Sequence, residues 1–158
     1  MQKITPFLWY DTQAEEAANF YVSIFKNSKV LGLTRCGEAG PGPKGSVLVA
    51  EFELAGQKFT ALNGGPNFKF TEAVSFVVNC ETQEEVDYFW EKLLEGGGTE
   101  SQCGWLKDKY GLSWQITPTI LPELLQDKDP KKANRVMQAM MKMVKIDIQT
   151  LKRAADGE

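Results

Sequence analysis

The sequence repeats one pattern of predicted elements, and this repeat restricts the fold more than any other feature. Residues 4–10 and 74–79 are apolar segments typical of β-strands. A Thr-x-x-Glu sequence follows each of them, at Thr12 to Glu15 and at Thr82 to Glu85, and predicts a capped helix start. Apolar residues at helical spacing come next in both halves. We therefore expect two copies of one structural module.

Three strand-like segments follow the predicted helix in each half. They cover residues 29–36, 46–54 and 57–63 in the first half and approximately residues 100–103, 104–109 and 112–118 in the second. Ala55-Gly56 and Tyr110-Gly111 are the tight turns that precede the last segment of each half. Each half is thus predicted as β-α-β-β-β. Because one such module cannot bury both faces of its sheet, the two modules must pair.

The predicted fold is α+β, with two paired β-α-β-β-β modules, a mixed curved sheet and a C-terminal helical extension. We expect a single domain over residues 1–120, with modules at 1–66 and 73–120, and the extension over residues 121–158. The first helix of the extension carries an apolar stripe: Ala133, Val136, Met137, Met140, Met143 and Val144. This stripe either packs on the sheet or a partner subunit, or binds a ligand. A second helix is predicted over residues 148–155, with Asp147 as its N-cap.

The sequence contains no histidine, which excludes several classes of catalytic site. Ser-His-Asp and Cys-His nucleophile systems and the two-histidine zinc motif all require this side chain. The three cysteines, Cys36, Cys80 and Cys103, fit neither a disulfide framework nor a CxxC zinc site. Free cysteines of this kind are typical of a reducing cytoplasm.

The charge pattern indicates neither a nucleic-acid partner nor a membrane partner. The formal net charge is −3, and the basic residues are scattered along the chain rather than clustered. The N-terminus lacks the apolar run of a signal peptide, and no segment reaches membrane-spanning length. We therefore expect a soluble, cytoplasmic protein.

Several short motifs allow a chemical interpretation beside a structural one. Gly40-Pro41-Gly42-Pro43-Lys44-Gly45 has the spacing G-x-G-x-x-G, but a dinucleotide loop needs free amides and a following helix, and a strand-like segment follows here. Glu51 and Glu53 share one face of a predicted strand, and three interpretations of the two are open: an acid–base pair, metal ligands or a solvated surface. Asp108 lies beside the Tyr110-Gly111 turn and is interpreted as a turn residue. Cys103 is either a reactive thiol or a buried, inert one.

Sequence motifs along essentially the whole chain carry a family resemblance. They are Ile4-Thr5-Pro6-Phe7-Leu8-Trp9, Ala14-Glu15-Glu16-Ala17, Phe20-Tyr21, Leu62-Asn63-Gly64-Gly65-Pro66, residues 74–80 with 82–90, Gly104-Trp105-Leu106-Lys107-Asp108-Lys109-Tyr110-Gly111, Ser113-Trp114-Gln115-Ile116, Ala133-Asn134-Arg135-Val136-Met137 and Lys145-Ile146-Asp147-Ile148. With the paired modules, these motifs resemble the vicinal oxygen chelate superfamily of glyoxalase I, bleomycin-resistance proteins and extradiol dioxygenases. The sequence is most similar to its PhnB-like group, often described as 3-demethylubiquinone-9 3-methyltransferase-like.

The resemblance also predicts where a metal site would lie. In metal-using members, four ligands come from the first and last strands of the two modules. The matching positions here are Pro6, Thr60, Ser75 and Gln115. Proline has no donor atom in its side chain, neutral hydroxyls are poor ligands, and no carboxylate or imidazole offsets a divalent charge. We therefore expect no metal and no other cofactor.

In the superfamily, the ligand cavity lies inside the curved sheet of each module, and strand alternation selects the residues that face it. The expected pocket residues are Leu8, Tyr10, Thr60, Leu62, Ser75, Val77, Ser113 and Gln115, with Trp105 as a further candidate that closes the pocket. The residues expected against the helices are Phe7, Trp9, Phe76 and Trp114. An apolar and aromatic pocket with a few hydroxyl and amide groups suits a small organic ligand.

Three functions remain open from the sequence. The first is a metal-independent, homodimeric binding protein for an apolar or aromatic small molecule. The second is an enzyme, such as a 3-demethylubiquinone-9 3-methyltransferase-like transferase or an isomerase, with Glu51, Glu53, Asp108 or Tyr110 as the candidate base. The third is a dimeric interaction module that uses the methionine-rich helix.

Overall fold

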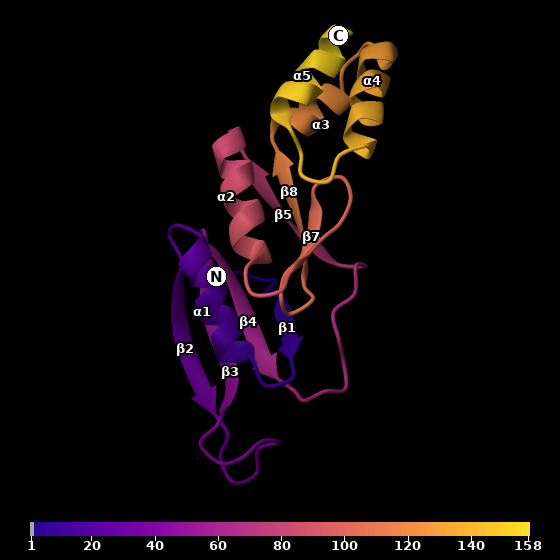
Figure 1. The fold of residues 1–158 in the computed structure, drawn as a ribbon. Helices are drawn as coiled ribbons and strands as arrows, with labels where there is room; N and C mark the ends of the chain where they lie inside the picture. The colour runs from indigo at the N-terminus through magenta and orange to yellow at the C-terminus, as the bar shows by residue number, and fades with distance from the viewer. Residues whose placement is uncertain (1) are drawn as a thin grey trace. The chain divides into compact units, whose positions relative to one another are not determined.

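The computed structural model describes residues 2–158, and the chain divides into two compact units, Met1–Phe70 and Thr71–Glu158. Each unit contains one four-stranded sheet, and one long helix lies across a face of that sheet (Figure 1). Two mixed sheets with helices form the α+β fold that the repeat predicts, and further helices follow the second sheet.

The first unit has the element order β-α-β-β-β. Its elements are β1 (Phe7–Tyr10), α1 (Ala14–Ile24), β2 (Lys29–Arg35), β3 (Val47–Leu54) and β4 (Gln57–Asn63). The strand order is β1-β4-β3-β2, in which β1 runs parallel to β4 and the other neighbours are antiparallel. Under α1, the Tyr21 ring stacks on Phe52 at 6.0 Å, and Phe52 stacks on Phe59 at 5.4 Å. Together these rings form an aromatic core between helix and sheet.

Helix α1 begins differently from the prediction. We expected Thr12 and Glu15 to form a capping box, but the helix starts at Ala14, and Gln13 before it makes no side-chain capping bond. Instead, the backbone N–H of Ala14 donates to Asn63 Oδ1 at 2.7 Å, and Asn63 Nδ2 donates to the Val47 carbonyl at 2.9 Å. The end of β4 therefore caps the helix, from 49 residues away in the chain.

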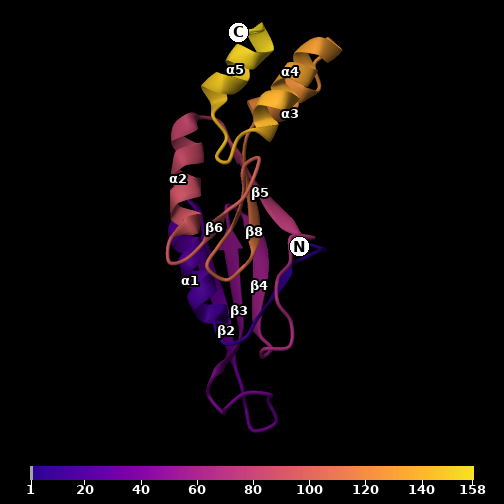
Figure 2. The ribbon, with the colours of Figure 1, turned by 45° about the vertical axis from the view of Figure 1, so that its right-hand side comes forward.

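The second unit repeats this element order and then continues. Its first elements are β5 (Ser75–Cys80), α2 (Gln83–Leu94), β6 (Thr99–Glu100), β7 (Trp105–Lys107) and β8 (Ser113–Pro118). The strand order is β5-β8-β7-β6, again with one parallel pair, β5 and β8. Helix α2 lies along one face of this sheet (Figure 2). Its start agrees with the prediction, because Thr82 Oγ1 accepts a hydrogen bond from the Glu85 amide at 3.2 Å.

Strands β6 and β7 are shorter than the predicted segments 100–103 and 104–109. The physical reason lies in the turn between them, where Cys103 and Gly104 both have positive φ angles, 59° and 83°. Their amides point to another segment, since Cys103 donates to the Met143 carbonyl at 2.8 Å and Gly104 to the Val144 carbonyl at 2.7 Å. These two amides donate to the C-terminal segment, so they are not available for a longer β6–β7 ladder.

Three helices form the C-terminal extension, α3 (Ile120–Leu125), α4 (Pro130–Met141) and α5 (Ile148–Asp156). The two expected helices are present, and Asp147 caps α5 by accepting from the Thr150 amide at 2.8 Å. The short α3 is an addition to the prediction. The helices bury a separate cluster of apolar residues: Leu121, Val136, Ile146, Leu151 and Ala155. Of the predicted stripe, Val136 and Met140 of α4 pack in this cluster, and so does Met143, which follows the helix because α4 ends at Met141. Met137 and Val144 remain exposed.

The extension is attached to the second module at the start of α2. Gln83 Nε2 donates to the Ile146 carbonyl at 3.1 Å, and Gln83 Oε1 accepts from the Ile148 amide at 2.8 Å. Nearby, Lys145 forms an ion pair with Asp87 at 2.7 Å. Ile146 itself is fully buried and packs over Gly104, where any Cβ would lie 2.9 Å from it. Among residues 2–158, every helix is too short or too polar to cross a lipid bilayer.

Candidate functional site

Each sheet has one face against its helix and one face away from it, which we call the distal face. On the second sheet, Leu106, Trp114 and Ile116 are buried on the helix side. Strand register and alternation therefore place on the distal face the residues Ser75, Val77, Trp105, Ser113 and Gln115. On the first sheet, Thr60 and Leu62 are distal, because Phe59 and Ala61 between them are buried under α1.

Two of the expected pocket residues lie on the opposite face. Leu8 and Tyr10 are only 6% and 3% exposed, and the Tyr10 hydroxyl lies 3.0 Å from the Tyr21 hydroxyl of α1. The predicted facing of β1 is therefore wrong by one residue. Phe7 and Trp9 occupy the distal face instead, in register with Thr60 and Leu62.

The reason is the packing around the Trp9 ring. Trp9 Nε1 donates to the Gly65 carbonyl at 2.9 Å, and Phe68 makes an edge contact with the ring at 4.8 Å. Gly64 lies so close to the ring that a Cβ there would be 2.4 Å from it. This cover lets a large aromatic residue face away from the helix.

A small recess on the distal face of the second sheet contains a hydroxyl without a partner. Ser113 is 1% exposed, and within residues 2–158 its Oγ has no hydrogen-bond partner. The recess has a volume of about 170 Å³, and its lining includes Trp105, Lys107 and Glu72. Lys107 forms an ion pair with Glu72, and its hydrogen bond is the main cause that lowers the pKa of the Glu72 carboxyl. Recognition groups of three kinds thus meet here: a hydroxyl, an indole and a lysine.

Beside the recess, two further predicted residues contact each other. Gln115 Nε2 donates to Ser75 Oγ at 2.9 Å, across the parallel pair β5 and β8. This bond uses one of the two N–H groups of the Gln115 amide, so the second N–H, the carbonyl oxygen and the Ser75 hydroxyl hydrogen are left for a ligand.

The four positions of the superfamily metal site do not fit a divalent cation. Thr60 and Ser75 supply neutral hydroxyls, Gln115 supplies an amide, and Pro6 supplies nothing. The distal residue of β1 in register with Thr60 is Phe7, which is equally unable to ligate. Within residues 2–158, no three His, Cys, Asp or Glu residues lie close enough to hold a metal ion.

The candidate bases have different environments. Asp108 is buried and accepts hydrogen bonds from the turn that it belongs to, so it has a structural role there. Tyr110 is in the same turn and donates its amide to Asp108. Glu51 and Glu53 are on the distal side of β3, where Glu51 is in register with Thr60 and Glu53 with Lys58. Of these residues, Glu51 is the exposed carboxylate beside a predicted pocket residue.

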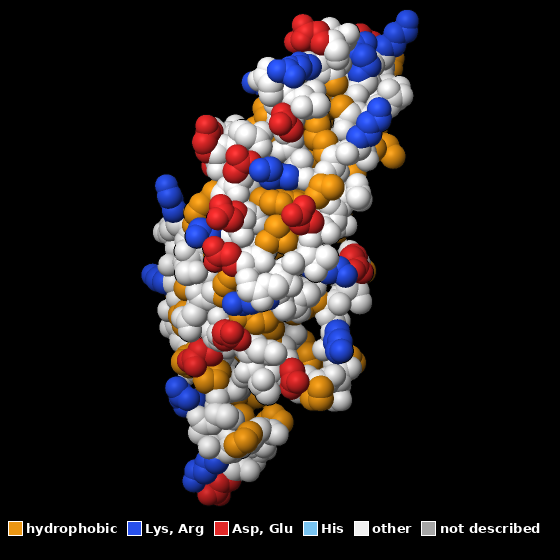
Figure 3. Space-filling view, in the orientation of Figure 1, with side chains coloured by type: hydrophobic (Ala, Val, Ile, Leu, Met, Phe, Trp, Pro, Cys, Tyr) orange, Lys and Arg blue, Asp and Glu red, His pale blue; other side chains and the backbone are white. Residues whose placement is uncertain are grey.

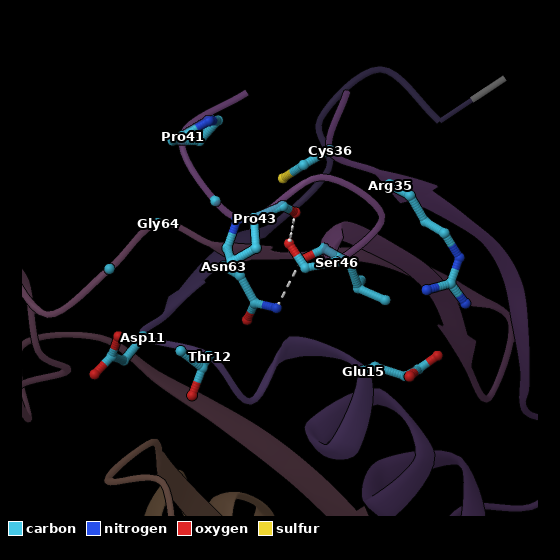
Figure 4. A pocket seen from close by; sticks show the side chains of 13 residues that line it. Asp11, Thr12, Glu15, Arg35, Cys36, Pro41, Pro43, Ser46, Asn63 and Gly64 are labelled. Carbon is cyan, nitrogen blue, oxygen red and sulfur yellow. Dashed lines mark hydrogen bonds between the residues drawn. The ribbon is translucent and has the colours of Figure 1, made fainter. Parts of the chain in front are cut away.

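The first unit also contains a pocket of about 660 Å³ that sequence reasoning did not identify (Figure 4). It lies where β1 and β4 end, beside the start of α1 and the loop between β2 and β3.

The loop between β2 and β3 contains the G-x-G-x-x-G sequence of residues 40–45, and it connects two antiparallel strands with no helix after it. A dinucleotide-binding loop of the strand–loop–helix type is therefore absent from this segment. The pocket depends on the path of this loop, which the sequence pattern did not reveal.

Comparison with known proteins identifies similar chains. The family described as 3-demethylubiquinone-9 3-methyltransferase has a sequence model that matches residues 2–117. The PhnB protein from Bacillus cereus is 43% identical with a TM-score of 0.68, over 75% of this chain and 100% of that chain. None of the curated proteins matches this chain.

Two more distant structures share the fold. A protein from Pseudomonas aeruginosa has 18% identity and a TM-score of 0.62, over 75% of this chain and 98% of that chain. The fosfomycin resistance protein FosX from Listeria monocytogenes has 16% identity and a TM-score of 0.58, over 80% and 98%. At these identities the likeness concerns the fold alone.

Proposed function

This chain belongs to the 3-demethylubiquinone-9 3-methyltransferase family, a PhnB-like group of the vicinal oxygen chelate superfamily, and from this premise we propose that it binds a small apolar or aromatic molecule without a metal ion. The proposed contacts lie on the distal face of each sheet, taken separately. They are Phe7, Trp9, Thr60 and Leu62 in the first unit, and Ser75, Val77, Trp105, Ser113 and Gln115 in the second.

The partnerless hydroxyl of Ser113 is the observation that carries this proposal. A buried hydroxyl without a hydrogen bond costs about 1–3 kcal/mol, so folded proteins rarely keep one without a reason. A ligand in the recess with one polar atom at Ser113 would remove that cost. The adjoining indole of Trp105 offers a flat apolar surface for an aromatic ring. A metal is not needed for this mode of recognition, and the donors at the superfamily positions do not suit one.

Native mass spectrometry of freshly purified protein, followed by thermal unfolding with 2-naphthol and 1,4-naphthoquinone, tests the proposal. We expect a retained or added organic molecule without a divalent metal, and a raised Tm that Ser113→Val reduces. The matched control is Ser101→Val, since Ser101 lines the rim of the same recess but is exposed. A stoichiometric metal that is lost on Gln115→Ala would overturn the metal-free mode. If the two probes bind equally to wild type and to Ser113→Val, the recess is not part of the binding site.

A second candidate is a methyltransferase, and the description of the matching family favours it. In that reaction a substrate hydroxyl attacks the methyl group of S-adenosylmethionine, a carbon–oxygen bond forms, the carbon–sulfur bond breaks, and a base takes the hydroxyl proton. Glu51, which is exposed and in register with Thr60, is the candidate base for this step. Incubation with S-adenosylmethionine and a hydroxyquinone should then give a product heavier by one CH₂ group, more slowly with Glu51→Gln than with Glu53→Gln. If no methylated product forms with the wild type, the chain is not this enzyme.

We further propose a homodimer in a reducing cytoplasm. Apolar side chains of the extension stay exposed, Met141 at 63% and Met137 at 38%, and hydrophobic atoms there lie among Lys and Arg side chains (Figure 3). Such a surface also suits an interaction module, because methionine adapts to different partners. The same native mass spectra report subunit number, and Met141→Lys should raise the monomer fraction while the exposed control Gln138→Lys leaves it unchanged. A wild-type monomer at all concentrations would contradict the dimer.

A further inference from the structure

The 660 Å³ pocket of the first unit has a chemistry unlike that of the distal faces. Its volume falls within the usual range for small-molecule sites. Asp11, Thr12 and Glu15 line it on the side of α1, and Arg35 lines it from the end of β2 (Figure 4). None of these residues belongs to the proposed ligand surface of the sheets.

Three charged side chains surround this pocket, and they do not neutralise one another. Within residues 2–158, Asp11, Glu15 and Arg35 make no ion pair within 4.0 Å, although ion pairs occur elsewhere in the chain. Arg35 is exposed, and its Nη1 donates to the Gly45 carbonyl at 3.1 Å, which leaves its other N–H groups available for a ligand. Glu15 is half-buried, so water screens its charge less than that of the exposed Asp11.

Two of the neutral polar side chains in the pocket, Asn63 and Ser46, already have partners. The Asn63 amide is used at both ends, by Ala14 and by Val47. Ser46 Oγ donates to the Pro43 carbonyl. The remaining walls are apolar, with Pro41, Pro43 and Val47 among them. The charged groups that remain for specific recognition in this pocket are two carboxylates and one guanidinium.

We propose that this pocket binds a molecule of the basic amino acid class, with two cationic groups and one carboxylate joined by an aliphatic chain. The carboxylate pairs with Arg35, whose planar guanidinium suits a carboxylate in a bidentate geometry. The two cationic groups pair with Asp11 and Glu15, and the ligand charge of +1 offsets the pocket charge of −1. The aliphatic chain lies along the proline wall.

Two other ligand classes fit less well. A phosphate or nucleotide would be repelled by two carboxylates, and no strand–loop–helix cradle is present to hold it. A divalent cation would have only two carboxylates and would face a guanidinium, and no group of three acidic or cysteine ligands occurs in residues 2–158. The mixed charge favours a ligand that itself carries both signs.

Isothermal titration calorimetry of the whole chain measures the affinity for three probes and so tests the ligand class. L-lysine has all three charges, norleucine lacks the side-chain ammonium, and 1,5-diaminopentane lacks the carboxylate. We expect L-lysine to bind about tenfold more tightly than either analogue, since each analogue loses one charge-assisted contact. We also expect its affinity to fall as salt is added. Equal affinity for all three probes, or no binding of L-lysine, would overturn the proposal.

Matched variants test the location. Glu15→Gln and Arg35→Gln should each weaken L-lysine binding about tenfold. The controls are Glu16→Gln and Lys29→Gln, which remove the same charges from exposed positions on the same helix and strand, outside the pocket lining. Thermal unfolding without ligand shows whether each variant is folded. Equal losses in Glu15→Gln and Glu16→Gln would place the ligand elsewhere. Ser113→Val should leave L-lysine binding unchanged, because Ser113 is not among the residues that line this pocket.

Discussion

Trp114 and Asp108 are joined by a buried hydrogen bond, in which the indole Nε1–H donates to Asp108 Oδ2 at 2.9 Å. The other carboxylate oxygen accepts from the amides of Tyr110 and Leu112 at 2.9 and 3.1 Å. One side chain thus closes the turn between β7 and β8 and fixes the indole in the core under α2. A carboxylate with these partners is a structural acceptor. Of the two interpretations of Asp108, a turn residue and a general base, the hydrogen bonds therefore favour the turn residue.

Replacing Asp108 should destabilise the protein strongly. In Asp108→Asn one oxygen becomes an NH₂ group that meets N–H donors, so buried donors lose their acceptor. We expect the free energy of unfolding to fall by about 3 kcal/mol in urea titrations. Asp156→Asn, an exposed change at the end of α5, should stay within about 0.5 kcal/mol of wild type. If Asp108→Asn keeps wild-type stability but loses an activity, Asp108 is a catalytic residue after all.

The two serines of the second distal face should respond in opposite ways to alanine. Ser75→Ala removes the acceptor of the Gln115 amide and should cost about 1 kcal/mol of unfolding free energy. Ser113→Ala removes a buried hydroxyl that has no partner and should be neutral or stabilising by up to about 1 kcal/mol. Chemical denaturation of the ligand-free chain measures both. A loss of 1 kcal/mol or more in Ser113→Ala would mean that its hydroxyl has a partner in solution.

Features set by local sequence were predictable. The repeat indicated both β-α-β-β-β modules, and Thr82 and Asp147 cap their helices from within the same turn. The facing of β8 followed from alternation, since Trp114 is buried and Gln115 is not. Short-range spacing contains the information for these features, because the interacting groups are neighbours in the chain.

Features that depend on distant segments were not predictable in this way. The cap of α1 comes from Asn63, and the cover of Trp9 comes from Gly64, Gly65 and Phe68, all more than 45 residues away. Strand alternation alone does not contain this cover, and the structure places Phe7 and Trp9 on the face opposite to the expected one. The charged pocket of the first unit has the same origin, since it needs the path of the β2–β3 loop.

Gln83 should control how firmly the C-terminal extension is held. Its amide bonds both to the Ile146 carbonyl and to the Ile148 amide, and alanine would leave both groups without this partner. We expect Gln83→Ala to lower the unfolding free energy by about 1–2 kcal/mol and to speed hydrogen exchange over residues 143–158. Glu84→Ala, an exposed neighbour on α2, is the control. Unchanged exchange in Gln83→Ala would show that apolar packing alone holds the extension.

The ion pair between Asp87 and Lys145 predicts a small pH effect on the same attachment. The hydrogen bond from Lys145 is the main cause that lowers the pKa of Asp87 in the folded state, and the Gln83 amide contributes. A lowered folded-state pKa means that this stabilisation is present above the unfolded pKa and is lost as the pH falls through the folded pKa. Because the pair is exposed, its contribution is about 0.5 kcal/mol. Asp87→Asn should therefore lose stability at pH 7 and match wild type in strong acid, and an equal difference at both pH values would contradict this.

The thiol of Cys80 should be the least reactive toward alkylation. Burial is the main cause that raises its pKa to about 12, and the nearby charge of Glu85 adds to the effect. At pH 8 the side chain is therefore a protonated thiol, whereas iodoacetamide reacts with the thiolate. Cys103 is only half-buried, so peptide mass spectrometry should show it modified well before Cys80 in the native chain. In guanidinium chloride the two rates should become similar, and a native Cys80 that reacts as fast as Cys103 would contradict its burial at the end of β5.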